Sequence, residues 1–149
     1  MAQAADIVLE ARQAADSRGR PTVEVSLKLG DIETIGDVPA GASKGEDEAR
    51  TVSVEQAIEH IHTTISAIIR ESGRSLDSHD DLLAIESAII DQSGENYATL
   101  GANAVLPVSR ALWKAAAKLR GMELCHYIRE FEPKLNHDGR VGFLMNIFN

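Results

Sequence analysis

Residues 40–45 carry the side chains best suited to binding a small ligand. This segment consists of Ala40, Gly41, Ala42, Ser43, Lys44 and Gly45 and directly follows a proline. Glycine lets a backbone approach a ligand closely, and a serine hydroxyl is a hard oxygen donor suited to Mg²⁺. The pattern is equally typical of an ordinary strand-to-helix connection in which Ser43 caps the helix. On pattern alone, the ordinary connection is favoured.

The other reactive side chains form no complete catalytic set. His60 and His62 are two residues apart, whereas two ligands on one helix face need a spacing of three or four. We therefore expect both at the surface or its boundary. His79 precedes two aspartates at a predicted helix start, where capping explains the carboxylates. Cys125 is the single cysteine, and we expect it to be a small buried residue.

The first third of the chain predicts β-structure. Residues 22–29 alternate apolar and polar side chains, the pattern of a strand with one solvent-exposed face. Apolar runs at 7–9 and 32–38 predict two more strands, with turns at 16–21 and 30–31. Short connections between adjacent strands favour an antiparallel meander.

The remaining elements read as about four helices. Apolar residues at helical spacing predict a first helix that ends at Gly73, with the acidic residues 46–48 at its start. A second helix follows Ser78, a third covers 100–119 and a fourth covers 123–131. Pro107 should bend or break the third helix. Strands followed by helices predict an α+β fold with the helices on one sheet face.

Composition limits the class of protein. The 149 residues carry 15 Lys and Arg against 23 Asp and Glu, a formal charge of −8. This length suits one domain, and the acidic balance argues against general nucleic-acid binding. No apolar run is long enough to cross a membrane, and no signal-peptide pattern is present. We therefore expect a cytoplasmic protein with neither a nucleic-acid nor a membrane partner.

Four motifs resemble the enolase (phosphopyruvate hydratase) family. They are D-S-R-G-R-P-T-V-E-V at 16–25, V-P-A-G-A-S-K-G at 38–45, L-G-A-N-A-V-L at 100–106 and M-N-I-F-N at 145–149. The second is similar to the enolase catalytic loop, usually P-S-G-A-S-T-G, and the third to the L-G-A-N-A-I-L-G-V-S helix. Because the four motifs occur in the family's order, the resemblance runs from about residue 7 to the last residue.

The resemblance implies an enolase N-terminal capping domain over 1–140, with 141–149 starting the connection to a C-terminal β/α barrel. It implies that Ser43 supplies a ligand to Mg²⁺ and that 40–45 closes over 2-phosphoglycerate, a phosphorylated small-molecule acid. Arg12 and Glu24 match positions of cross-subunit ion pairs, which implies a homodimer or higher homo-oligomer. The family's catalytic residues lie in the barrel, so none is expected in this chain, which alone should be inactive.

Departures from the family pattern leave alternatives open. Ala40 and Lys44 stand where the family usually has Ser and Thr, and Arg20 stands where it has Asn. A paralogue acting on a related phospho- or phosphono-acid would also fit these changes. A third possibility is a stand-alone binding module that docks through the edge of its sheet.

Overall fold

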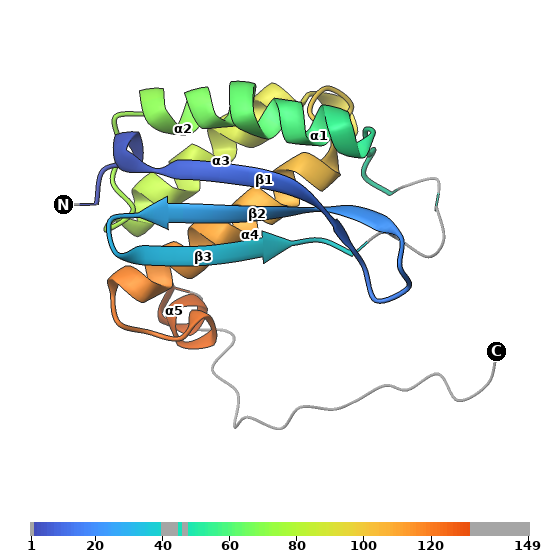
Figure 1. Ribbon diagram of the computed structural model, residues 1–149. Helices are drawn as coiled ribbons and strands as arrows, with labels where there is room; N and C mark the ends of the chain where they lie inside the picture. The colour runs from blue at the N-terminus through green and yellow to red at the C-terminus, as the bar shows by residue number, and fades with distance from the viewer. Residues whose placement is uncertain (1, 40–44, 46–47, 132–149) are drawn as a thin grey trace.

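Three antiparallel strands in sequence order form the sheet, as the alternation of side chains predicts (Figure 1). The computed structural model describes residues 2–39, residue 45 and residues 48–131. The strands are β1 (Val8–Ala15), β2 (Pro21–Leu29) and β3 (Ile32–Asp37). In the central strand Val23, Val25 and Leu27 are fully buried, while Lys28 is exposed on the opposite face. One face of the sheet therefore belongs to the core.

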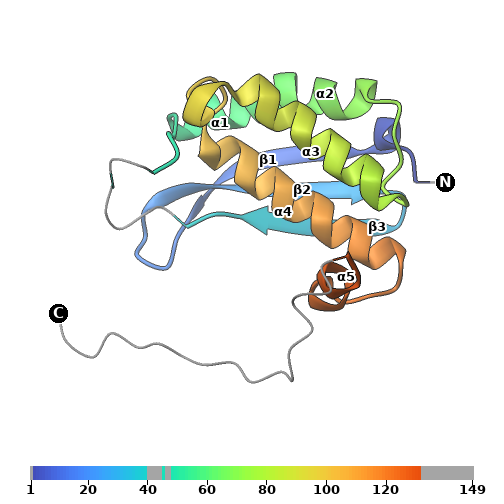
Figure 2. The ribbon, with the colours of Figure 1, turned by 180° about the vertical axis from the view of Figure 1, so that it is seen from behind.

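The helices cover that buried face and leave the other face open (Figure 2). Between short 3-10 turns at Ala4–Asp6 and Glu95–Tyr97, the chain forms α1 (Val54–His60), a π-helical turn (Ile61–Ile65), α2 (Ser66–Glu71) and α3 (His79–Ser93). The helices α4 (Ala102–Leu119) and α5 (Leu124–Phe131) follow. The observed class is α+β, as the order of elements predicts. Among the described residues, no helix is long and apolar enough to cross a membrane.

The first helix begins later than its acidic residues suggested. It starts at Val54, and Ser53 forms a capping box with Gln56: each side chain bonds the other residue's backbone N–H, both at 3.2 Å. The prediction that acidic residues 46–48 lie at its start was wrong for Glu48, which precedes the helix by several residues. Glu46 and Asp47 lie outside the described residues. A reciprocal cap satisfies two backbone donors, whereas a nearby carboxylate offers only charge.

Helix α4 continues through Pro107 as one element, so of the predicted bend or break, the break was wrong. Pro107 is buried, and its carbonyl oxygen lies against Gly36 of β3, where an added Cβ would be only 1.8 Å away. Two backbones meet here with no side chain between them. The packing of this helix face on the sheet offsets the hydrogen bond that proline removes.

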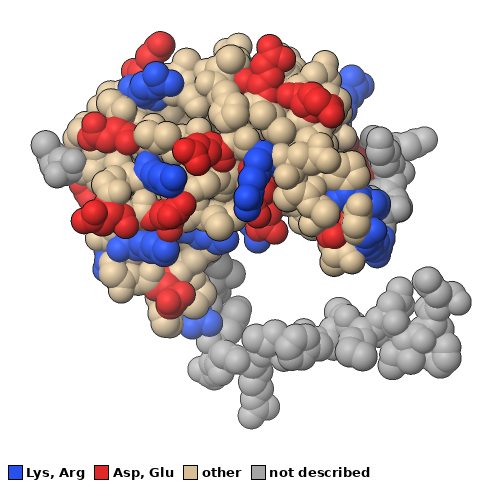
Figure 3. Space-filling view, in the orientation of Figure 1, with Lys and Arg blue, Asp and Glu red and all other residues tan. Residues whose placement is uncertain are grey.

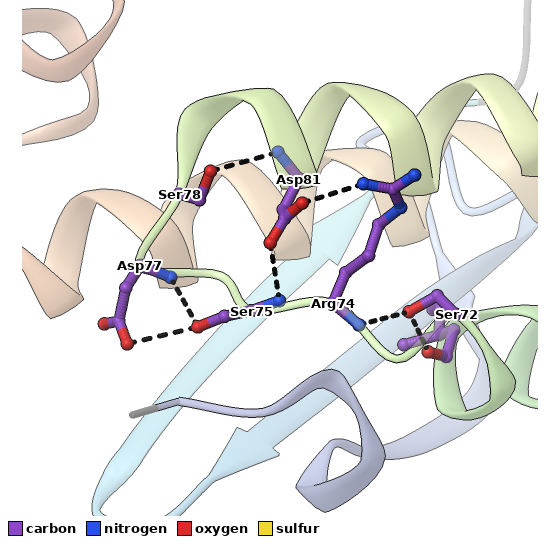
Figure 4. A network of polar contacts seen from close by, with 7 residues as sticks. Ser72, Arg74, Ser75, Asp77, Ser78 and Asp81 are labelled. Carbon is purple, nitrogen blue, oxygen red and sulfur yellow. Dashed lines mark hydrogen bonds and ion pairs between the residues drawn. The ribbon is translucent and has the colours of Figure 1, made fainter.

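The connection between α2 and α3 is held by carboxylates (Figure 4). Asp81 accepts the backbone N–H of Ser75 at 3.1 Å and the Arg74 guanidinium at 2.8 Å. Ser78 caps α3 by accepting from the Asp81 N–H at 3.3 Å. Asp77 accepts the N–H of Ala2 at 2.8 Å, which ties the start of the chain to this turn. The predicted helix start is confirmed with Ser78 as its cap, whereas the Asp81 carboxylate binds the preceding turn.

Helix α5 buries the face that carries Tyr127 and exposes Cys125. The prediction of a buried cysteine was wrong because two residues along a helix correspond to a rotation of about 200°. His79 stacks on Phe131 with ring centroids 3.7 Å apart. The Tyr127 hydroxyl lies 3.4 Å from His79 Nδ1. His79 therefore packs the helices together.

We expect Gly36→Ala to destabilise the fold by about 3 kcal/mol, the upper end of the overpacking range, because the contacting atoms belong to backbone. Gly30→Ala is the matched control: Gly30 has φ +56° with no atom near its added Cβ, so backbone strain alone costs about 1 kcal/mol. Urea unfolding measures both. Equal losses would contradict the close approach at Gly36.

Candidate functional site

The predicted ligand segment is described only at its boundaries. Ala40, Gly41, Ala42, Ser43 and Lys44 lie outside the described residues, so their predicted roles remain predictions. Gly45 is exposed, and its carbonyl accepts the Glu48 N–H at 3.3 Å. The geometry of the site comes from the two stems that hold this segment, an entry stem at 37–39 and an exit stem at 48–52.

The entry stem is fixed by a guanidinium and a hydroxyl. Arg110 of α4 donates to the carbonyl oxygen of Asp37, and its Nη1 lies 3.6 Å from the Asp37 carboxylate. The hydroxyl of Thr22 in β2 donates to the Val38 carbonyl. The chain therefore leaves β3 in a direction set by two other elements.

The exit stem is bound by the start of α4 and the turn before it. The Asn103 side chain is bidentate to one residue: its oxygen accepts the Val52 N–H at 3.0 Å, and its amide donates to the Val52 carbonyl at 2.9 Å. The Arg50 carbonyl accepts the Ala102 N–H at 2.8 Å. Asn96 donates to the Glu48 carbonyl at 3.1 Å. Both stems thus rest on α4 or the turn that precedes it.

A hollow of about 430 Å³ lies beside the entry stem at the end of the sheet. It is lined by Ala14, Ala15, Asp16, Ser17, Thr22, Glu24, Asp37, Val38, Pro39 and Arg110. Each of its three carboxylates is ion-paired with an arginine: Asp16 with Arg20, Glu24 with Arg12, and Asp37 with Arg110. Arg110 is the only cationic residue in this lining, so the described wall is predominantly acidic.

Asp16 organises the turn between β1 and β2. One carboxylate oxygen accepts the backbone N–H groups of Arg18 at 2.8 Å and Arg20 at 2.9 Å. The other pairs with the Arg20 guanidinium at 2.8 Å. These bonds, chiefly the one from the Arg20 backbone, lower the pKa of Asp16. Arg20, a departure from the family pattern, therefore fixes this turn through its side chain as well as its backbone.

Arg12 and Glu24 lie on the open face of the sheet, where acidic and basic side chains are interspersed (Figure 3). They are cross-strand partners in the β1–β2 register, and Arg12 Nε donates to Glu24 at 2.7 Å. Arg12 stays largely exposed, at 74% of its side-chain surface. An exposed pair of this kind adds little to stability. Their predicted contact with a second subunit remains a prediction.

His60 at the end of α1 and His62 in the π-helical turn each bind a backbone group. His60 Nδ1 lies 2.9 Å from the Leu100 carbonyl, and His62 Nε2 accepts the Ala11 N–H at 2.9 Å. His62 is exposed and His60 half-buried, as their spacing predicted. Within the described residues, no group of three or more His, Cys, Asp or Glu side chains could hold a metal ion.

Sequence reasoning missed three residues that position the stems. The sequence motifs at 16–25 and 100–106 include Thr22 and Asn103 but do not indicate their role in the stems. No sequence pattern pointed to Arg110. Their bonds join positions 16 to 73 residues apart, so local spacing could not reveal them. A polar residue in the buried part of an alanine-rich helix is the one hint that could have singled out Asn103.

Comparison with known proteins gives a consistent result. The family model described as "Enolase, N-terminal domain" matches residues 7–128. An enolase of Corynebacterium kroppenstedtii is 38% identical over 141 residues, which cover 86% of this chain and 31% of that protein. An enolase of Mycobacteroides abscessus is 38% identical over 125 residues, covering 79% and 29%. The chain therefore spans less than a third of the length of these relatives.

We expect Asp16→Asn to remove a pH-dependent part of the stability. The pKa of Asp16 is lowered in the folded state, so its carboxylate stabilises the fold above about pH 4, the unfolded pKa. That contribution is lost as the pH falls through the lower folded pKa. Urea unfolding from pH 2 to 6 should show a wild-type advantage that shrinks below about pH 4. A pH-independent difference would rule out this role.

Asn103→Ala should cost about 1–3 kcal/mol, since it leaves both polar groups of the Val52 backbone without their partner. Amide exchange at Val52 should accelerate markedly. Asn103→Asp keeps the acceptor and loses the donor, so we expect an intermediate effect. Gln92→Ala on the exposed surface of α3 is the control and should change stability by less than about 0.5 kcal/mol. A neutral Asn103→Ala variant would contradict the bidentate role.

Proposed function

The chain belongs to the enolase N-terminal domain family, and we propose that it is this domain of an enolase-like lyase. The longer protein would remove water from 2-phosphoglycerate to give phosphoenolpyruvate. The domain would contribute the ligand segment 40–45 and contacts between subunits. Its catalytic acid and base would lie in a C-terminal β/α barrel, so the isolated chain would be inactive.

The observation that carries this proposal is the support of the ligand segment. Thr22, Asn103 and Arg110 fix the stems on either side of 40–45, and two of these residues belong to α4. Because a fixed stem lies on each side of the segment, we interpret residues 40–45 as a ligand segment held by a rigid frame and not as an ordinary connection. Precise placement of a ligand group is what a site needs in order to act on a small acid.

Within this proposal, Ser43 offers one hydroxyl ligand to Mg²⁺, and the remaining ligands come from outside this chain. When bound, Mg²⁺ stabilises the negative charge that develops as the α-proton leaves. Lys44 places a cation near the phosphate and carboxylate of the substrate, where it increases their attraction to an otherwise acidic domain. The glycines at 41 and 45 let the backbone approach the acid closely.

Further parts of the proposal concern assembly and location. The domain would pack against its own barrel, and the longer protein would form a homodimer or a higher homo-oligomer. Arg12 and Glu24 would exchange their mutual ion pair for contacts with a partner subunit, which the exposed side chain of Arg12 on the open face favours. A protein acting on a phosphorylated intermediate would work in the cytoplasm, without a nucleic-acid or membrane partner.

Two alternatives to the dehydration of 2-phosphoglycerate remain. Ala40 and Lys44 remove two hydroxyls and add a cation relative to the family pattern, which favours a paralogue acting on a related phospho- or phosphono-acid. The other alternative is a stand-alone binding module that would dock through the edge of its sheet. The reading frame beyond residue 149 separates the module from the enzyme, because only the enzyme needs a barrel.

The decisive assay uses the protein from the complete reading frame with 2-phosphoglycerate and Mg²⁺, following the absorbance of the enol product. We expect turnover by the complete protein and none by the 149-residue chain. Ser43→Ala should lower kcat/KM at least about tenfold if the hydroxyl is a metal ligand. Ser53→Ala, which removes only the α1 cap, is the matched serine control.

Turnover by the isolated chain would overturn the assignment of catalysis to the barrel. An inactive complete protein that turns over a phosphonate analogue would favour the paralogue. Equal activity of the Ser43→Ala and Ser53→Ala variants would remove Ser43 from the site.

A further inference from the structure

Strand β3 lies at an edge of the sheet, where unpaired backbone groups are a template for another strand. It is six residues long and pairs with β2 on one side. In an antiparallel ladder, the carbonyls of alternate residues point away from the neighbouring strand. For β3, the outward carbonyls are those of Glu33, Ile35 and Asp37, since each accepts a bond from a side chain outside the sheet.

Each of these three carbonyls accepts a hydrogen bond from a cationic side chain of α4. Lys118 Nζ donates to the Glu33 carbonyl at 2.7 Å, and Lys114 Nζ donates to the Ile35 carbonyl at 2.6 Å. Arg110 donates to the Asp37 carbonyl. The three donors are four residues apart on the helix, so they form one stripe along its surface.

Helix and strand match in length along this stripe. Four helical residues advance by about 6.0 Å, and two strand residues by about 6.7 Å. Because the two steps nearly agree, each turn of α4 delivers one cation to the next outward carbonyl of β3. The close contact at Gly36 brings α4 near enough for these side chains to reach the edge.

We propose that Arg110, Lys114 and Lys118 close the β3 edge against strand addition, with a second copy of this chain as the strand they exclude. A pairing strand needs the outward carbonyls as acceptors, and here they already accept charge-assisted bonds. It would also have to displace three long cationic side chains from the edge. This proposal is independent of the proposed function, and it argues against docking of a partner through this edge.

At the opposite edge of the sheet, β1, a helix side chain also binds a backbone group. The Ala11 N–H of β1 donates to His62 of the π-helical turn, and α1 and this turn pack against β1. Helix side chains therefore bind backbone groups at both edges. Among the described residues, the open face exposes Val8 at 54% and Ile35 at 46%.

The test removes the three donors and keeps their side-chain length, as Arg110→Met, Lys114→Met and Lys118→Met together. The control carries Lys28→Met, Arg70→Met and Arg129→Met, which removes the same charge from exposed positions elsewhere. Sedimentation velocity over a range of concentrations reports self-association. Hydrogen exchange of the Glu33, Ile35 and Asp37 amides reports whether association uses the β3 edge, and circular dichroism reports folding.

We expect the edge variant to self-associate increasingly as its concentration rises. Its Glu33, Ile35 and Asp37 amides should then exchange at least tenfold more slowly than in the wild type. The control variant should match the wild type in both measurements. Sedimentation and exchange equal to those of the control would overturn the proposal. So would a wild type that already self-associates with these amides protected. If the triple variant does not fold, a double variant with Lys114→Met and Lys118→Met replaces it and leaves Arg110 in place. Its control carries Lys28→Met and Arg70→Met. The same results in sedimentation and amide exchange support or overturn the proposal.

Discussion

The close approach of β3 and α4 at Gly36 is the constraint on which the rest of the structure depends. Only a residue without a Cβ fits there, because the Pro107 carbonyl occupies the space that a side chain would need. The hydroxyl of Thr34, two residues earlier, donates to the Ala111 carbonyl at 2.9 Å and fixes the same contact from within the core. Strand and helix are thereby held at one distance and in one register.

That register has two consequences along α4, one at its first turn and one farther along the helix. Its cationic stripe reaches the outward carbonyls of β3, and Arg110 at the end of that stripe also fixes the entry stem. Its first turn carries Asn103, which binds the exit stem. A single helix thus supports the sheet edge and both ends of the proposed ligand segment. Stems fixed in this way reduce the conformational entropy that the segment must lose when it orders on a ligand.

Sequence patterns were enough for the class of fold and for most of its elements. Alternation in β2 and helical spacing in α3 and α4 act over a few residues, so they can be read directly. The errors arose where tertiary packing overrides a local rule: Pro107 stays helical because it packs on Gly36, and Cys125 is exposed because Tyr127 takes the buried face of α5. The stem residues Arg110 and Asn103 were not predicted as such because their partners are distant in sequence. The glycines and Ser43 singled out the ligand segment, but the pattern alone favoured an ordinary connection, and its ligand role was predicted by the resemblance.

Native-state hydrogen exchange tests the central claim, that α4 joins the stems and the sheet into one unit. The diagnostic amides are those of Arg50, which donates to the Asn96 carbonyl, and of Val52 and Ala102, compared with core amides of α4. We expect the amides of Arg50, Val52 and Ala102 to open with the same free energy and the same denaturant dependence as the core amides of α4. If the amides at 50 and 52 opened at a small fraction of that free energy while α4 stayed protected, the stems would not be part of the frame, and the central claim would be contradicted.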